Sequence, residues 1–312
     1  MEIKDLKLIF MGTPAISAYV FEKMVLAGYH FVALIAQPDK NKNKKGILEK
    51  VPTKIIAEKY NIPVYQPLKI RKEYEFIKEL NPDIIITLAY GQIVPQGLLD
   101  IPPLGCLNLH GSLLPKYRGA SPIQTSLINN DKITGMTLMA MSKDMDAGNI
   151  YAKKEVIIDE DDNNTSLFNK MALAAESLIL ESLPLYINGQ LKGVEQDINQ
   201  VSYCSTIKPE QEHLNLNLSA SHINGWIKAL SDVPGGYLYL DNLKIKIFKA
   251  QVIEENYCGD VGEIVKADKK GLYIKCLDKT LSILELQKEG KKRMSYKDFI
   301  NGFLNIKGKK FN

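Results

Sequence analysis

Four short, largely apolar runs mark the first part of the chain. They lie at Leu6–Met11, Phe31–Ala36, Ile84–Leu88 and Gly105–His110. A run of this length without clear polar alternation is typical of a strand that is buried on both faces of a parallel sheet. We therefore expect these four runs to be neighbouring strands of one sheet.

The segments between these runs have apolar residues at the spacing of a helix. Apolar positions recur at helical intervals between Ile16 and Met24, and the chain breaks at Gly28. Further helices are expected at Thr53–Tyr60 and Leu167–Leu185, and further strands at Gly135–Met141 and Asn149–Ile158. Strands that alternate with helices in this way indicate an α/β domain with a mostly parallel sheet covered on both faces. We assign residues 1–188 to it.

The pattern changes after residue 188. Residues 189–206 lose periodicity and are interpreted as an interdomain linker. Residues 207–312 begin with a helix at Ser219–Leu230 and continue as five short alternating runs. These runs lie at Tyr237–Leu240, Lys244–Ala250, Gly262–Lys266, Gly271–Cys276 and Thr280–Leu286. Five short strands separated by turns predict a small β-barrel of the OB type.

Length and composition agree with two soluble domains. The chain has 312 residues, of which 45% are hydrophobic and 24% charged. No apolar stretch reaches the roughly 18 residues that a membrane span needs, and the N-terminus lacks a signal-peptide pattern. The four cysteines form no CxxC or Cys/His cluster. We expect a cytoplasmic, monomeric protein with reduced thiols, no bound metal and no membrane contact.

Positive charge is concentrated near the C-terminus. Residues 205–312 hold 18 Lys/Arg against 13 Asp/Glu, whereas residues 1–204 hold 22 against 23. This asymmetry favours a polyanionic partner, although a lysine-rich solvated surface would give the same count.

Two polar residues interrupt the apolar run that ends at His110. Because side chains alternate along a strand, Asn108 and His110 share one face, while leucines take the other. Asp146 lies in the turn after the apolar strand Thr137–Met141, and we expect it at the same end of the sheet. Ligands of open parallel sheets bind beyond the carboxyl ends of the strands. Asn108, His110 and Asp146 are therefore candidate catalytic residues.

This trio suits acyl transfer to an amine. An amide can stabilise a tetrahedral oxyanion, an imidazole can manage a proton, and a carboxylate can orient the imidazole. No serine or cysteine stands in a nucleophile motif, which favours direct transfer without a covalent enzyme intermediate. The alternative is structural: His110 would cap a strand, Asn108 would satisfy a loop carbonyl, and Asp146 would form a turn beside Gly148.

Two other classes of protein remain open. A nicotinamide-dependent oxidoreductase would use a similar sheet, but Gly12-Thr13-Pro14 lacks the GxGxxG pattern of a dinucleotide-binding turn. A non-catalytic RNA-binding protein would explain the basic C-terminal part and would leave the polar trio unexplained.

A longer motif surrounds the trio. The stretch Asn108–Ile123 reads NLHGSLLPKYRGASPI and resembles the signature of the folate-dependent formyltransferases. Asp146, before Ala147-Gly148, is similar to the catalytic aspartate of that family. The likeness extends through Gln37-Pro38-Asp39, Ala89-Tyr90-Gly91 and Gly290-Lys291-Lys292, and it spans nearly the whole chain.

The resemblance implies a fold, a donor and a site. The fold would be a Rossmann-like catalytic domain followed by an OB-like domain, and the donor would be 10-formyltetrahydrofolate. Asn108, His110 and Asp146 would be catalytic. The folate pocket would draw on two loops, whose residues are Ser112, Leu113, Leu114 and Pro115 in one, and Leu88, Tyr90, Gly91 and Gln92 in the other.

Three kinds of acceptor occur in this family: initiator methionyl-tRNA, sugar amines, and water in the hydrolase-like domain of formyltetrahydrofolate dehydrogenase. A basic loop, residues 39–54, follows the second strand, at the sheet end where the site is expected. It contains lysines and no arginine, and lysines that neutralise phosphates add affinity for nucleic acid. We therefore expect initiator methionyl-tRNA as the partner. Its expected contacts are Lys40, Lys42, Lys44, Lys45, Lys50, Lys54, Lys291, Lys292 and Arg293.

Overall fold

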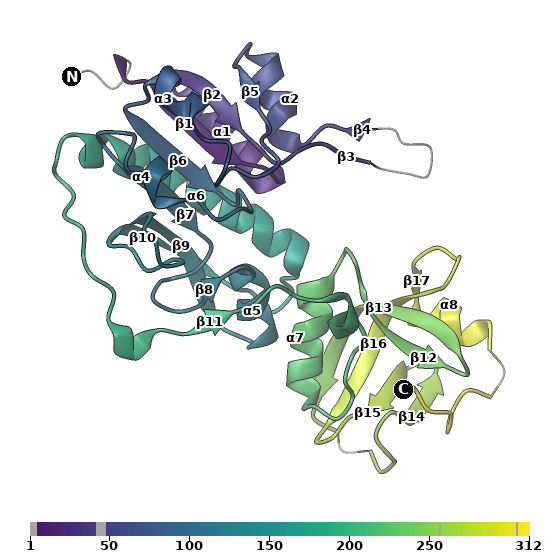
Figure 1. The fold of residues 1–312 in the computed structure, drawn as a ribbon. Coiled ribbons are helices and arrows are strands. Elements are labelled where there is room, and N and C mark those ends of the chain that lie inside the picture. Colours follow the sequence, from purple (N-terminus) through teal and green to yellow (C-terminus); the bar gives the residue numbers. More distant parts are fainter. Residues whose placement is uncertain (1–4, 42–47, 256, 304) are drawn as a thin grey trace. The chain divides into compact units, whose positions relative to one another are not determined.

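Two compact units make up the computed structural model, which describes residues 5–41, 48–255, 257–303 and 305–312. The first unit comprises residues up to 120 together with 133–157 and 168–204. The second comprises residues 205–312 together with 121–132 and 158–167 (Figure 1). The second unit therefore includes two segments that precede residue 188, whereas the sequence patterns assign all of residues 1–188 to the first domain and 207–312 to the second.

A seven-stranded sheet forms the first unit, in the order β10-β9-β7-β6-β1-β2-β5. Its strands are β1 (Leu8–Gly12), β2 (Phe31–Ile35), β5 (Val64–Tyr65), β6 (Ile84–Leu88), β7 (Cys106–His110), β9 (Ile133–Ala140) and β10 (Ile150–Ile157). The five strands from β7 to β5 are parallel to one another, while β9 and β10 run antiparallel. The predicted mostly parallel α/β sheet is confirmed.

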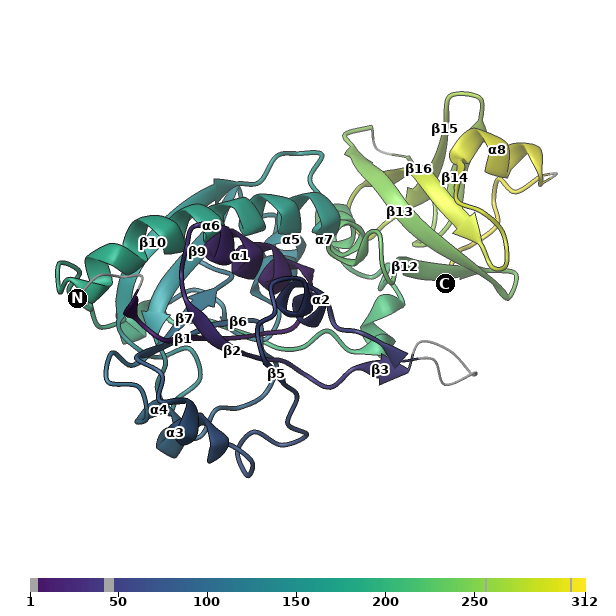
Figure 2. The same cartoon turned by 90° about the horizontal axis from the view of Figure 1, so that it is seen from above.

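Helices cover both faces of this sheet (Figure 2). Phe10 faces α1 (Ala15–Leu26), where its ring stacks on Phe21 with centroids 4.9 Å apart. Ile9 faces the other side, in a core shared with α3 (Phe76–Leu80) and α4 (Gln96–Leu99). The remaining helices of this unit are α2 (Pro52–Lys59) and most of α6 (Asn164–Ile187). Burial on both faces explains why these strands read as continuous apolar runs.

The direction of β9 changes the expected placement of Asp146. Because β9 is antiparallel to β7, its last residue, Ala140, pairs with Leu107 near the start of β7. The turn after β9 therefore begins at the opposite end of β7 from His110. The expectation that Asp146 itself lies near His110 agrees with the structure, in which Asp146 Oδ1 is 3.6 Å from His110 Nδ1, but the end of β9 does not account for it. The connection 141–149 runs back along the sheet, and only this return brings Asp146 to His110.

The predicted linker contains ordered structure. Residues 189–204 belong to the first unit and include a 3-10 helix at Ile198–Gln200 and strand β11 (Tyr203–Cys204). Strand β11 pairs in parallel with β8 (Arg118–Gly119), which follows the motif of β7. The sequence gives no sign of these elements in the stretch interpreted as a linker, because a two-residue strand leaves no periodic signal. The hairpin of β3 (Lys40–Asn41) and β4 (Leu48–Glu49) was undetected for the same reason.

The second unit is built on an antiparallel sheet in the order β12-β13-β16-β15-β14, with β17 paired to β16. These strands are β12 (Gly236–Leu240), β13 (Leu243–Ile253), β14 (Ile264–Asp268), β15 (Gly271–Lys275), β16 (Thr280–Lys288) and β17 (Met294–Ser295). Helices α7 (Ala220–Leu230) and α8 (Tyr296–Asn301) pack on its core through Ile223, Ile227 and Phe299. All five predicted strands are present, and closure into an OB-type barrel stays a prediction.

Helix α5 (Pro122–Ile128) belongs to this second unit through a close contact with α7. A Cβ added to Gly225 of α7 would lie 2.5 Å from the carbonyl oxygen of Ile128 and 2.7 Å from that of Leu127. No side chain fits at this approach, which accounts for a glycine inside the helix despite its low helix propensity.

We expect Gly225→Ala to lower the free energy of unfolding of the second unit by about 1–3 kcal/mol, because overpacking forces the two helices apart. On an unconstrained helix the same change would stabilise by up to about 1 kcal/mol. Thermal unfolding measures the difference, with the exposed Ser221→Ala on the same helix as the control. A Gly225→Ala protein that melts higher than the parent would contradict the close helix contact.

Among the described residues, no helix is long and apolar enough to cross a membrane.

Candidate active site

Strand β7 presents the two polar residues of the motif on the face that α3 and α4 cover. Cys106 is part of the core on that face, so Asn108 and His110, two and four residues further on, point the same way. His110 is 6% exposed, and Asn108 is partly exposed. The predicted pairing of these two side chains on one face is consistent with this alternation.

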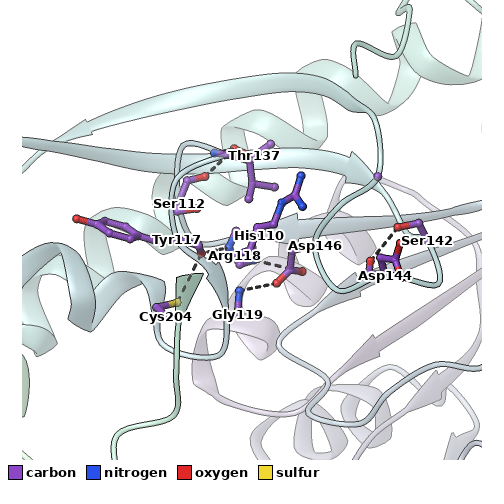
Figure 3. A network of polar contacts seen from close by, with 12 residues as sticks. His110, Ser112, Tyr117, Arg118, Gly119, Thr137, Ser142, Asp144, Asp146 and Cys204 are labelled. Atoms are coloured by element: carbon purple, nitrogen blue, oxygen red, sulfur yellow. Dashed lines mark hydrogen bonds and ion pairs between the residues drawn. The ribbon is translucent and has the colours of Figure 1, made fainter. Parts of the chain in front are cut away.

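Main-chain geometry sets the orientation of His110 (Figure 3). Its Nε2 lies 2.9 Å from the carbonyl oxygen of Tyr117. A carbonyl oxygen only accepts hydrogen bonds, so Nε2 carries a hydrogen and donates it. In the neutral imidazole the other nitrogen, Nδ1, is then a free base with a lone pair. The side chain is thus held in the tautomer that can take up a proton at Nδ1.

Asp146 lies next to that nitrogen. Its Oδ1 is 3.6 Å from His110 Nδ1, too far for a hydrogen bond but close enough for strong attraction to a protonated ring. Its Oδ2 accepts a hydrogen bond of 2.8 Å from the backbone nitrogen of Gly119. Asp146 has a φ of 52°, a left-handed conformation that aspartate tolerates better than most residues. The structure thus brings Asp146 and His110 together, while Tyr117 supplies the orienting hydrogen bond.

The carboxamide of Asn108 remains available to a ligand. It forms no hydrogen bond to another described residue. Thr87 of β6 is its partner in the parallel register, so the two side chains project from the same face of the sheet. The hydroxyl of Thr87 is buried and also lacks a hydrogen-bond partner among the described residues. The Asn108 carboxamide and the Thr87 hydroxyl, neither with a hydrogen-bond partner among the described residues, therefore lie on neighbouring strands near the end of the sheet where His110 lies.

The loop after β7 uses much of its polar capacity internally. Ser112 Oγ donates to the carbonyl of Lys116 at 2.6 Å, and Thr137 Oγ1 donates to the carbonyl of Ser112 at 2.6 Å. The backbone nitrogen of Leu114 donates to Thr137 Oγ1 at 3.1 Å, and Leu114 is fully buried. Leu113 and Pro115 are half-buried. Residues 112–115 are therefore held in a fixed conformation. The hydrogen of the Ser112 hydroxyl is already used in a hydrogen bond.

The loop after β6 is also held in place by hydrogen bonds. The carbonyl of Tyr90 accepts hydrogen bonds from Thr13 Oγ1 at 3.3 Å and Gln37 Nε2 at 3.1 Å. The Tyr90 ring is buried in the core, its hydroxyl has no partner among the described residues, and burial raises the pKa of its phenol. The Gln92 side chain accepts from the backbone of Ile70 and donates to the carbonyl of Pro67.

Leu88 ends β6 as a buried residue, and Gly91 adopts a φ of 86°. That left-handed conformation suits glycine and gives the loop its sharp turn.

Two of the lysines expected to contact RNA are engaged in ion pairs. Lys54 Nζ lies 2.5 Å from Asp39 Oδ2, and Lys50 Nζ lies 2.6 Å from Glu58 Oε2. Burial alone would raise the pKa of Asp39, but hydrogen bonds from Lys54 and Gln66 outweigh it and hold that pKa below its usual value. Lys40 is exposed on β3.

The expected contacts Lys42, Lys44 and Lys45 lie outside the described residues.

The three basic residues near the C-terminus differ in their surroundings. Arg293 donates to Asp232 and Glu285, each at 2.6 Å, and its guanidinium lies 4.4 Å from the centre of the Phe248 ring. Lys291 and Lys292 are exposed. Arg293 is thus committed to the second unit, whereas its two neighbours face solvent.

A basic hollow of about 260 Å³ lies beside them, between β13 and β16. Lys244, Lys246 and Lys288 line it. Burial and the nearby Lys291 lower the pKa of Lys288. Lys244 and Lys246 carry no separate signal in the sequence, because two lysines that alternate with isoleucines along one strand also fit an ordinary solvent-facing side of that strand.

Other residues of the site also escaped sequence analysis. Tyr117 and Gly119 act through backbone atoms, which every residue type possesses. Gln196 bonds to the main chain of the Asp146 loop, but it lies in the stretch interpreted as a linker. Thr87 was predicted as part of a strand and carried no further signal. Among the described residues, no group of three or more His, Cys, Asp or Glu could hold a metal ion.

Comparison with known families agrees with the arrangement of two units. The model of the formyl transferase family matches residues 6–183, and that of the formyl transferase C-terminal domain matches residues 206–304.

Curated relatives match over nearly the full length. A methionyl-tRNA formyltransferase of Lactobacillus acidophilus is 42% identical over 297 residues, which cover 94% of each chain. Another from Staphylococcus aureus is 38% identical over 308 residues, covering 97% of this chain and 99% of the relative.

Solved structures share the fold at lower identity. An N-formyltransferase from Helicobacter canadensis, in complex with folinic acid and dTDP-3-aminofucose, superposes with a TM-score of 0.68 at 21% identity, covering 91% of this chain and 99% of that one. HypX from Aquifex aeolicus in complex with tetrahydrofolic acid gives 0.64 at 15% identity, over 96% of this chain and 47% of that one.

Proposed function

This chain belongs to the methionyl-tRNA formyltransferases, and we propose that it transfers the formyl group of 10-formyltetrahydrofolate directly to the α-amino group of methionine on initiator tRNA. The observation that carries the site assignment is the 3.6 Å approach of Asp146 Oδ1 to His110 Nδ1, on the sheet face that also bears Asn108. In this proposal His110 supplies the base, Asp146 the carboxylate and Asn108 the hydrogen-bond donor that formyl transfer to an amine requires.

His110 acts as the proton acceptor. The neutral methionine amine attacks the formyl carbon, and its nitrogen becomes positively charged as the new C–N bond forms. That nitrogen must then lose a proton. Nδ1 of His110 carries a free lone pair, because the ring hydrogen is on Nε2 and is donated to the Tyr117 carbonyl. The Asp146 carboxylate stabilises the resulting imidazolium, directly or through an intervening water.

Asn108 stabilises the other charge. Attack on the formyl carbon converts its carbonyl oxygen into an oxyanion, and the carboxamide can donate a hydrogen bond to it. Collapse of the tetrahedral intermediate breaks the bond from the formyl carbon to N10 of the folate, which leaves with the electron pair and receives a proton. No covalent bond to the enzyme forms at any step.

The folate donor is proposed to lie along the loops after β6 and β7. Leu88, Tyr90, Gly91 and Gln92 would line one side, and Ser112, Leu113, Leu114 and Pro115 the other. The uncommitted hydroxyls of Thr87 and Tyr90 fit a ligand with many polar ring atoms, because a buried hydroxyl without a partner costs free energy that a bound group can restore.

The tRNA is proposed to contact lysines of both units. They are the exposed Lys40 in the first unit, the exposed Lys291 and Lys292 in the second, and Lys42, Lys44 and Lys45, which lie outside the described residues. Lys50, Lys54 and Arg293 could contribute only in competition with their present ion pairs.

We expect the double change Lys291→Ala and Lys292→Ala to raise the tRNA Michaelis constant and to reduce the slope of log affinity against log salt by about one per lost phosphate contact. The double change Lys269→Ala and Lys270→Ala removes the same charge from two other exposed lysines and serves as the matched control. Arg293→Ala should instead lower the melting temperature, because it leaves Asp232 and Glu285 unpaired. Equal salt slopes in both double variants would remove Lys291 and Lys292 from the interface.

One assay tests the whole proposal. The protein is mixed with 10-formyltetrahydrofolate and, in separate reactions, methionyl-initiator tRNA, methionyl-elongator tRNA or an amino-sugar nucleotide. Formylation of the initiator tRNA above both controls is the expected outcome. Formylation of the sugar nucleotide instead would assign the chain to another acceptor class.

A further inference from the structure

The segment after α6 ties together the loops that carry the candidate catalytic groups. Gln196 donates both amide hydrogens, one to the carbonyl of Asp146 and one to that of Gly148, each at 2.8 Å. Its Oε1 accepts a hydrogen bond of 3.0 Å from Arg118 Nε. One half-buried side chain thus uses both of its donor hydrogens and its acceptor oxygen at the site.

These bonds close a ring around Asp146. Gln196 holds the main chain of Asp146, and Gly119, which follows the Arg118 that Gln196 also binds, holds its carboxylate through a backbone nitrogen. The same loop supplies the Tyr117 carbonyl that accepts from His110. Gln196 therefore connects the main chain that carries the carboxylate to the loop that orients the imidazole.

Strand β11 fixes that loop from the other side. The backbone nitrogen of Tyr117 donates to Ser202 Oγ at 2.9 Å, and that of Arg118 to the Ser202 carbonyl at 2.8 Å. A Cβ on Gly119 would lie 2.1 Å from the carbonyl oxygen of Cys204, so the strands meet at a distance that only glycine allows. The Arg118 end of the Gln196 connection is thus anchored by backbone that packs closely against residues 202–204.

We infer that Gln196 is a positioning residue for formyl transfer, which sets the distance between the Asp146 carboxylate and His110 Nδ1. This inference rests on the proposed function. Asp146 has a left-handed backbone and lies in a connection that runs back along the sheet, so no neighbouring strand pairing holds it in place. Without the two amide bonds, the connection relaxes and the 3.6 Å approach lengthens. Misplacement of a reacting group by about 1 Å can cost on the order of 100-fold in rate.

The test uses the full-length protein and steady-state formylation of methionyl-initiator tRNA. Gln196→Met keeps the length of the side chain and removes all three bonds, while Gln196→Glu keeps the acceptor for Arg118 and removes both donors to the Asp146 loop. We expect both variants to lose about 10- to 100-fold in kcat with unchanged KM for either substrate. Gln200→Met, an exposed glutamine of the same segment, is the matched control and should retain parental kinetics.

A double-mutant cycle separates positioning from general stability. If Gln196 acts through Asp146, adding Gln196→Glu to an Asp146→Asn protein should cost little more than Asp146→Asn alone. A full multiplicative loss, parental kcat in both Gln196 variants, or a rise in KM without a fall in kcat would each overturn the inference. Absence of formyl transfer by the parent protein would instead refute the proposed function.

Discussion

Asn108→Ala should lower kcat for formyl transfer by about 100- to 1000-fold, because it removes the hydrogen-bond donor that we propose for the developing oxyanion. The Michaelis constants for folate and tRNA should change little, since the amide gains its importance only when the carbonyl oxygen becomes charged. The Asn108 side chain forms no hydrogen bond to another described residue, so its truncation breaks no internal bond and should leave the melting temperature nearly unchanged. Single-turnover kinetics with methionyl-initiator tRNA measure the effect.

Asn108→Asp is the matched variant for this result. It preserves the shape of the side chain and places an acceptor, ionised at neutral pH, where the oxyanion forms. We expect it to be at least as slow as Asn108→Ala. An active aspartate variant would show that the residue supports the site sterically and does not stabilise charge.

Asp146→Asn should lower kcat by on the order of 100-fold or more, within the usual range for loss of acid–base assistance. The asparagine can still accept the hydrogen bond from Gly119, so the loop keeps its conformation while the charge beside His110 Nδ1 disappears. The imidazolium formed on proton uptake then lacks its counter-charge. The pH dependence of kcat should change shape, and folate binding, measured by fluorescence titration, should not.

Combination of the two changes tests whether these residues act as one unit. The double variant Asn108→Ala with Asp146→Asn should lose less than the product of the two single losses, because each group is useful only when the other supports the same intermediate. Strictly multiplicative losses, or near-parental turnover of Asp146→Asn across pH, would indicate that the aspartate is structural.

The lysines show where charge counts in a sequence mislead. Lys54 and Arg293 contribute to basic clusters along the chain, yet each faces carboxylates that are distant in sequence or on other strands. Asp232 and Arg293 are 61 positions apart. Local density of positive charge therefore predicted a basic surface and could not predict which cations remain available for phosphate.

The sequence by itself determined the buried strands, the alternation that places Asn108 and His110 on one face, and the change to an antiparallel sheet after residue 206, because these depend on periodicities of a few residues. Only the tertiary structure decided that the chain brings Asp146 back from the far end of β7, and that the Tyr117 carbonyl selects the His110 tautomer. It also decided that Gln196 holds the Asp146 connection and that Ser202 holds the loop at Tyr117. These contacts use backbone atoms, which are alike at every residue, and join segments up to 85 positions apart. No local pattern of side chains encodes such contacts, so they emerge only when the chain has folded.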